Sequence, residues 1–228
     1  MTMALLLILT LTAYLLGSCP NGLLVARTQG IDIRAVGSGN IGATNVFRSV
    51  GKAPGILVFF LDASKGLVPA LVFPRVAEQG VAPSIPVDTM SLVFGAAAIA
   101  GHTWPIYLRF RGGKGVATSA GVLIGIAPAA AGIGMFVWLI LVLGTRYVSV
   151  GSMGAALTVA ISGWLLYARE SGPTLPIALT ILAAIIFLRH RSNLRRLANG
   201  TENRISLSRR HLAEDSTSRS SHSGDPSQ

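Results

Sequence analysis

Long apolar runs, separated by short polar segments, make up most of this 228-residue chain. Several of them approach the length of about 20 residues that an α-helix needs to cross a bilayer. Only 12% of the residues are charged, whereas soluble domains carry about 25%. The sequence therefore predicts an all-α, polytopic integral membrane protein built as a helical bundle.

The formal net charge of +10 narrows the choice of ligands. The basic residues border apolar runs, a pattern that favours membrane orientation and anionic ligands over nucleic acid. The single cysteine, Cys19, excludes an intrachain disulfide and any metal site made of several cysteines. The polar segments also contain no carboxylate pair suitable for a two-metal site, and we expect no metal and no cofactor. Met1–Leu16 lacks a basic segment before its apolar run, which favours a first membrane span over a cleaved signal peptide.

The apolar runs predict the positions of the spans. Pro20 removes a hydrogen bond from the first run and is expected to break that helix between Gly17 and Gly22. The expected spans cover residues 3–25, 54–73, 89–108, 150–168 and 175–188, and the run at 116–143 has two interpretations.

Charge asymmetry decides between one span and a hairpin for residues 116–143. Gly125 and Pro128 interrupt this run, and a single crossing would place Arg146 and the basic C-terminal region opposite the other basic clusters. A hairpin keeps them together, in agreement with the positive-inside rule. We therefore predict about seven membrane segments including two short ones, with the N-terminus outside and the C-terminus cytoplasmic. Arg75 and Arg169 are the exceptions, on the outer side.

Composition also divides the chain. Residues 1–202 hold the apolar runs and are predicted to form the membrane-embedded domain. Residues 203–228 are rich in Ser, Arg and Asp with little apolar content, which predicts a disordered cytoplasmic tail.

The polar segment at residues 36–52 is rich in glycine, small polar residues and, at Arg48 and Lys52, positive charge. Such loops can turn several backbone N–H groups toward one anion, for example a phosphate. The alternative is a flexible loop between helices. A second glycine-rich basic segment at residues 109–118 favours phosphate binding.

With the hairpin, an even number of membrane crossings separates these segments. The two loops therefore lie on the same membrane face as Thr145–Ser149 and Arg189–Asn193. Together these segments supply cations, amides and hydroxyls, as a pocket for phosphorylated ligands requires. Simpler roles stay open: His102 and His190 as ordinary interface residues, Ser149 as a helix cap, and Arg195 and Arg196 as lipid-headgroup contacts. Asp62 and Lys65, within a span, either support the site or only fix helix packing.

Three motifs carry a resemblance to a known family. Gly37–Arg48 is similar to the first signature of the PlsY family of acyl-phosphate:glycerol-3-phosphate acyltransferases. Gly101–Pro105 with Phe110–Thr118 resembles the second, and Arg189–Leu197 with Gly200–Glu202 resembles the third. The resemblance extends over about residues 5–205.

The resemblance implies an enzyme of the bacterial inner membrane with its active site at the cytoplasmic face. It would transfer an acyl group from acyl-phosphate to the sn-1 hydroxyl of glycerol 3-phosphate, releasing lysophosphatidic acid and phosphate, the first step of phospholipid synthesis. Its partners would be these two substrates, membrane lipids and the enzyme that makes acyl-phosphate. The implied catalytic residues are Ser38, Arg48, Lys114, Ser149, His190 and Asn193. The implied phosphate-binding residues are Gly37, Gly39, Asn40, Thr44, Asn45, His102, Gly112, Gly113 and Gly115, supported by Asp62 and Lys65.

Two other functions stay open. An organic-anion transporter would share buried cations and broken helices, but the sequence shows no inverted repeat. An acyltransferase that uses acyl-CoA or acyl-carrier protein commonly carries a histidine followed, after four residues, by aspartate. His102, His190 and His211 are followed at that spacing by Tyr107, Arg195 and Ser216. We therefore expect direct attack by the acceptor hydroxyl, with no protein nucleophile.

Overall fold

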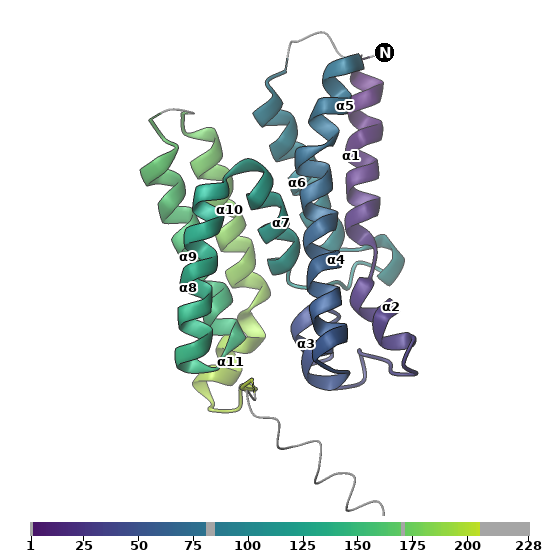
Figure 1. The fold of residues 1–228 in the computed structure, drawn as a ribbon, viewed down its shortest axis with the longest axis vertical. Helices are drawn as coiled ribbons and strands as arrows, with labels where there is room; N and C mark the ends of the chain where they lie inside the picture. Colours follow the sequence, from purple (N-terminus) through teal and green to yellow (C-terminus); the bar gives the residue numbers. More distant parts are fainter. Residues whose placement is uncertain (1, 81–84, 170–171, 206–228) are drawn as a thin grey trace, which may run out of the picture.

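The computed structural model describes residues 2–80, 85–169 and 172–205, and this part of the chain is helical without any β-strand (Figure 1). The predicted all-α bundle is confirmed. The helices are α1 (Thr2–Ser18), α2 (Asn21–Arg27), α3 (Ala43–Ser49), α4 (Lys52–Leu71), α5 (Phe73–Gly80), α6 (Val87–Thr103), the 3-10 turn η1 (Ile106–Leu108), α7 (Val116–Ile126), α8 (Pro128–Thr145), α9 (Val148–Leu166), α10 (Thr174–Arg189) and α11 (Arg191–Ala198).

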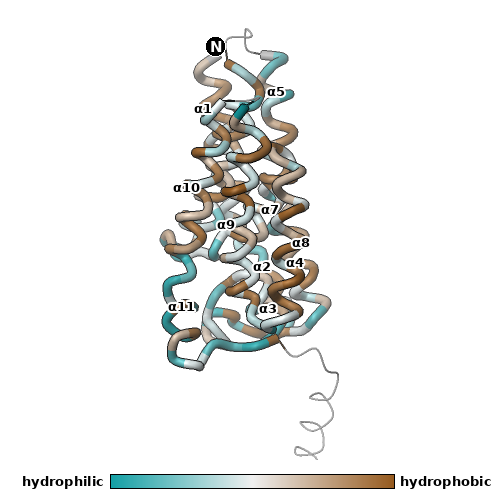
Figure 2. Tube along the Cα trace, turned by 90° about the vertical axis from the view of Figure 1, so that its left-hand side faces the viewer, coloured by the Kyte–Doolittle hydropathy of each residue, from teal (hydrophilic) through white to brown (hydrophobic). Residues whose placement is uncertain are grey.

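The long helices form two groups that α7 connects (Figure 1). In the first group α1 packs against α6 and α4 packs against α7; in the second, α9 packs between α8 and α10. Apolar residues cover the helix shafts, and polar residues concentrate around α11 and the neighbouring loops (Figure 2). By length and composition, four helices can cross a membrane, and a fifth if α10 and α11 count as one bent span.

The first span is broken where the sequence predicts. Helix α1 ends at Ser18 and α2 begins at Asn21, with Cys19 and Pro20 between them. Pro20 has no N–H to donate into the helix, and the turn instead closes with a bond from the Asn21 N–H to the Cys19 carbonyl (3.0 Å).

Residues 116–145 form the predicted hairpin, because the chain reverses direction at Ala127 between α7 and α8 (Figure 1). Helix α7 has 11 residues, about 17 Å, and is too short to cross a hydrocarbon core of about 30 Å. Helix α8 is longer than predicted: Pro128 begins it and it continues to Thr145, so its 18 residues can span. Only one arm of the hairpin is therefore short.

Close backbone packing holds the short α7 in place. A Cβ on Gly121 would overlap the carbonyl oxygen of Ala63 in α4, and a Cβ on Gly66 would overlap that of Thr118 in α7. Small residues that let two backbones approach are the common device of helix packing in membranes. This contact fixes the start of α7, next to the second basic loop.

Labelling from the two sides of the membrane tests the topology. In a Cys19→Ala background, cysteines placed singly at the exposed positions Ser38, Arg146 and Asn199 should react with an impermeant reagent from the cytoplasmic side. Cysteines at Arg75 and Arg169 should react only from outside, since they follow the opposite helix ends. Labelling of position 146 from outside would contradict the predicted orientation of the hairpin.

Candidate active site

The carboxylate of Glu202 joins the segments of the third motif to α9. Its Oε1 accepts hydrogen bonds from Ser149 Oγ (2.8 Å) and Asn193 Nδ2 (2.6 Å), and its Oε2 accepts one from Arg196 Nε (2.7 Å). Burial alone would raise the pKa of Glu202, but these bonds outweigh burial and hold the pKa below its usual value. Glu202 is therefore a buried anion within a basic region.

Lys114 connects the second motif to this carboxylate. Its ammonium group donates to Asn193 Oδ1, while the amide of Asn193 donates on to Glu202. Burial lowers the pKa of Lys114 to about 8, although the nearby Glu202 opposes that effect. An ammonium group has three N–H donors, and the bond to Asn193 uses one of them.

The segment that follows α11 lies across the cluster and brings Arg48 to it. Arg48 Nη2 donates to the Asn203 carbonyl (2.9 Å), and burial lowers the pKa of Arg48. Arg204 donates to the Tyr147 hydroxyl (3.0 Å), and the Ile205 N–H donates to the Arg146 carbonyl (2.9 Å). The contacts therefore continue three residues past the predicted domain boundary at 202, and residues 206–228 lie outside the described part.

The first glycine-rich loop is organised around the buried side chain of Asn45. Its Oδ1 accepts the Ser38 N–H (2.9 Å), and its Nδ2 donates to the carbonyls of Ile33 (3.1 Å) and Val36 (3.0 Å). Val36 O also accepts the Gly39 N–H (3.0 Å). Asn45 thus braces this loop from within.

The second loop is fixed on both sides. The N–H groups of Gly112 and Gly113 donate to the carbonyls of Thr103 (3.2 Å) and His102 (3.1 Å). Their own carbonyls accept from Arg189 Nη2 at 3.1 and 3.0 Å. The expectation that loop N–H groups converge on a phosphate is therefore wrong for Gly112 and Gly113, as it is for Ser38 and Gly39: all four N–H groups bond within the protein.

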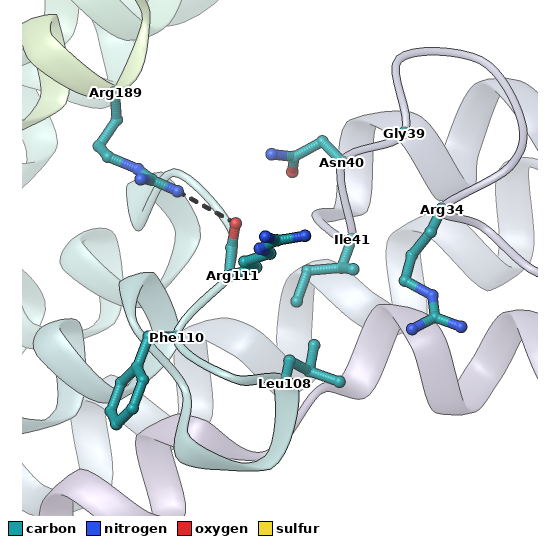
Figure 3. A pocket seen from close by; sticks show the side chains of 9 residues that line it. Arg34, Gly39, Asn40, Ile41, Leu108, Phe110, Arg111 and Arg189 are labelled. Carbon is teal, nitrogen blue, oxygen red and sulfur yellow. Dashed lines mark hydrogen bonds between the residues drawn. The ribbon is translucent and has the colours of Figure 1, made fainter.

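A cavity of about 450 Å³ lies between the two loops. Figure 3 shows Arg189, Arg111 and Asn40 directed toward the same space, whereas Phe110 points away from it. The remaining lining comes from Arg34, Gly39, Ile41, Leu108 and Gly112. Arg34 is paired with the carboxylate of Asp32 at 2.8 Å. The guanidinium groups of Arg111 and Arg189 therefore make the cavity suited to an anion, which these two side chains would bind.

The structure thus divides the predicted site residues into four groups. The first group is the cluster around Glu202, which contains Asn193, Ser149 and, through Asn193, Lys114. Arg48 borders this cluster at the Asn203 carbonyl. The buried His190 lies between α10 and α11, with its Nδ1 2.8 Å from the Ile186 carbonyl. Gly39, Asn40 and Gly112 line the cavity. Gly37, Ser38, Thr44 and Asn45 belong to the first loop and the start of α3, and Gly113 and Gly115 to the second loop. His102, Asp62 and Lys65 lie buried beneath the second loop.

Comparison with known proteins shows the family of this chain. The sequence profile described as glycerol-3-phosphate acyltransferase matches residues 7–200. The chain belongs to the glycerol-3-phosphate acyltransferase family. It is 45% identical over 199 residues to the enzyme of that name from Geobacter sulfurreducens, covering 87% of this chain and 97% of the relative. The Aquifex aeolicus relative is 42% identical over 201 residues, with 87% and 98% covered.

Crystal structures support the same assignment. The glycerol 3-phosphate form of PlsY (YgiH), an integral membrane glycerol 3-phosphate acyltransferase, superposes with a TM-score of 0.78 at 39% identity, covering 88% of this chain and 96% of that one. The lysophosphatidic acid form gives 0.76 at 38% identity, with 88% and 95% covered. As a member of the glycerol-3-phosphate acyltransferase family with this fold, the chain is a multi-pass membrane enzyme, and its resemblance to the PlsY family is confirmed.

Sequence reasoning missed Glu202 and the three arginines that line the cavity. Glu202 was visible only as an acid beside the third motif, and Arg189 and Arg111 only as neighbours of predicted site residues. Arg34 was visible only as a basic residue that flanks the first loop, and it lines the cavity because of the path of that loop. Ser149 was considered as a helix cap, but its hydroxyl bonds Glu202 and Tyr147 precedes the helix as its N-cap.

Replacing Glu202 tests its place in the cluster. Glu202→Gln removes the charge that accepts from Ser149, Asn193 and Arg196, and should destabilise the fold by about 2 kcal/mol, since hydrogen bonds to charged groups contribute about 1.5–3. That corresponds to a fall in Tm of roughly 4–8 °C for a chain of this size. Thermal unfolding in detergent measures it, with the exposed Glu78→Gln as control. Equal Tm values for the two variants would contradict the assignment.

Proposed function

We propose that this enzyme transfers an acyl group from acyl-phosphate to the sn-1 hydroxyl of glycerol 3-phosphate, giving lysophosphatidic acid and inorganic phosphate. Such a reaction would begin membrane phospholipid synthesis. The observation that carries the proposal is the meeting of three distant motifs, through Arg48, Lys114 and Asn193, at one basic cluster. Two anionic substrates repel each other, and fixed cations are what hold them together.

The mixed anhydride of the donor is already activated, so the protein need not supply a nucleophile. The acceptor hydroxyl oxygen forms a bond to the acyl carbon, and the bond from that carbon to the phosphate oxygen breaks. The electron pair leaves with phosphate, and a substrate phosphate oxygen takes the hydroxyl proton. The enzyme contributes orientation and charge stabilisation.

The contacts give each residue a distinct task in this scheme. Lys114 and Arg48 would hold phosphate oxygens, and Asn193 orients Lys114 while Glu202 orients Asn193. Ser149, His190 and Ser38 would complete the substrate surface near them. Arg111, Arg189 and Asn40 would receive a second phosphate in the adjoining cavity.

The proposed reaction also suggests where in the cell the enzyme acts. A soluble acceptor must meet an acyl donor at a lipid surface, which fits an active site on the cytoplasmic face of the bacterial inner membrane. The enzyme that makes acyl-phosphate would be its supplier. No metal or coenzyme takes part in the proposed chemistry.

Two alternatives give different results with purified protein. A transporter for organic anions would consume no substrate, and an acyltransferase of another donor class would use acyl-CoA or acyl-carrier protein. The clustering of polar groups at one end of the bundle argues against the transporter, whose sites lie near the membrane midplane.

Donor choice is the first test. The purified enzyme should release phosphate from acyl-phosphate when glycerol 3-phosphate is present, and should do so in excess chelator. Turnover with acyl-CoA at a comparable rate, or loss of activity in chelator, would overturn the proposed donor and mechanism.

The charge of Lys114 is the second test. With a pKa of about 8, Lys114 is charged below pH 8 and loses its charge as pH rises, while a phosphate monoester stays dianionic above about pH 7. The KM for glycerol 3-phosphate should therefore rise above pH 8, by up to about tenfold per pH unit. Lys114→Arg should move this rise to higher pH, because arginine stays protonated.

Two further variants separate charge from packing. Lys114→Ala should lower kcat/KM by about 30- to 150-fold at pH 7, the effect of losing a charged contact of about 2–3 kcal/mol. Arg195→Ala, an exposed cation on α11, serves as the control and should be near neutral. Normal kinetics in Lys114→Ala would show that this cation only orients the chain in the membrane.

A further inference from the structure

Charged and polar side chains from three helices meet beneath the second loop, apart from the Glu202 cluster and from the cavity. Asn21 begins α2, Asp62 and Lys65 lie on α4, and His102 lies in the last turn of α6. Asp62, Lys65 and His102 are only 2%, 5% and 4% exposed. Ionisable groups inside a membrane protein are costly unless they are paired, and groups of this kind commonly mark functional sites.

Asp62 and Lys65 form an ion pair, and the break in the first span supplies hydrogen-bond partners to both residues. Lys65 Nζ lies 2.9 Å from Asp62 Oδ1 and donates to the Cys19 carbonyl at 2.7 Å. Asn21 Nδ2 donates to the same carboxylate oxygen at 3.0 Å. The interruption at Cys19–Pro20 thus supplies a backbone acceptor to Lys65 and a side-chain donor to Asp62. The pair joins α4 to the junction between α1 and α2.

The His102 ring lies between the Asp62 carboxylate and the second loop. Its Nδ1 lies 3.7 Å from Asp62 Oδ1 and, among the described residues, has no hydrogen-bond partner. The opposite edge of the ring is against Gly113, where a Cβ would overlap Nε2. The ring therefore fills the space between the Asp62 carboxylate and the loop backbone.

The loop above the ring has little freedom. Its two glycine N–H groups bond to α6 and its two glycine carbonyls bond to Arg189, as described above. The next residue is Lys114, which reaches Asn193. The position of the Gly113 backbone against the His102 ring therefore fixes the position of the Lys114 backbone.

We propose that Asn21, Asp62, Lys65 and His102 form a positioning network that aims Lys114 at Asn193. Asp62 orients the His102 ring, and the ring sets the position of Gly113 and hence of Lys114. The functional part of this inference rests on the proposed role of Lys114. Displacement of a substrate-binding group by about 1 Å is enough to lower a rate about 100-fold.

The ionisation of Lys114 reports its position without any need for turnover. Competitive amine acetylation followed by mass spectrometry measures its pKa, and the exposed Lys52 provides the internal reference. The charged groups that influence Lys114 are Glu202, Arg196, Arg48 and Arg189, and His190 lies close enough to respond to its charge. A Lys114 that leaves its buried place beside Asn193 should regain an ordinary lysine pKa.

The decisive variant is Asp62→Asn with Lys65→Met, which removes both charges and leaves no buried charge unpaired. We expect it to insert and fold, with the pKa of Lys114 at least one unit higher and the KM for glycerol 3-phosphate about tenfold higher than in the wild type. Ser64→Ala, an exposed change on the same helix, should alter neither. A folded double variant with wild-type values for both quantities would overturn the inference, because the pair would then only pack helices.

Gly113→Ala provides the same test if the double variant does not fold. It leaves the ion pair intact and places a methyl group against His102, so it should raise the pKa of Lys114 and the KM together. Wild-type values in this variant would also overturn the inference. A wild-type enzyme that transfers no acyl group would refute the proposed function and leave the acetylation result, and hence the positioning network, standing.

Discussion

The hydrogen bonds to the Glu202 carboxylate are the interactions on which the site depends. Lys114, Arg48 and Arg196 would repel one another without a nearby anion, and Glu202 is held ionised by the three donors around it. Through Asn193 its influence reaches Lys114 in the second motif. One acid therefore allows basic groups from separate segments to share a small volume, and leaves a surplus of positive charge for substrate.

The bundle delivers these groups by two kinds of contact. Close approach of α4 and α7 at Gly66 and Gly121 places the start of α7, and with it the second loop, next to α6. The buried Asp62–Lys65 pair then joins that region to the break in the first span. The short α7 brings the second loop next to α6, and the break between α1 and α2 supplies the Cys19 carbonyl that accepts from Lys65. A straight span would place neither group there.

Much of this architecture follows from sequence. Apolar length and the distribution of arginines predicted the hairpin at residues 116–143, and Pro20 predicted the broken span, because both depend on local chemistry and the bilayer. The length of α8 was underestimated, since glycines such as Gly132 and Gly134 are tolerated inside it. The internal bonding of the loop N–H groups was not predictable, because it depends on how each loop folds back on nearby residues such as Thr103 and Asn45. The part of Glu202 was not predictable because its partner Ser149 lies far away in sequence.

We propose that phosphate binds at the cluster formed by Arg48, Lys114 and Asn193. A crystal structure of the complex with glycerol 3-phosphate would locate the phosphate. This proposal places phosphate oxygens within about 3 Å of Lys114 Nζ or of the Arg48 guanidinium, since charged hydrogen bonds have about that length. A phosphate bound away from both side chains, for example midway along the helices, would contradict it.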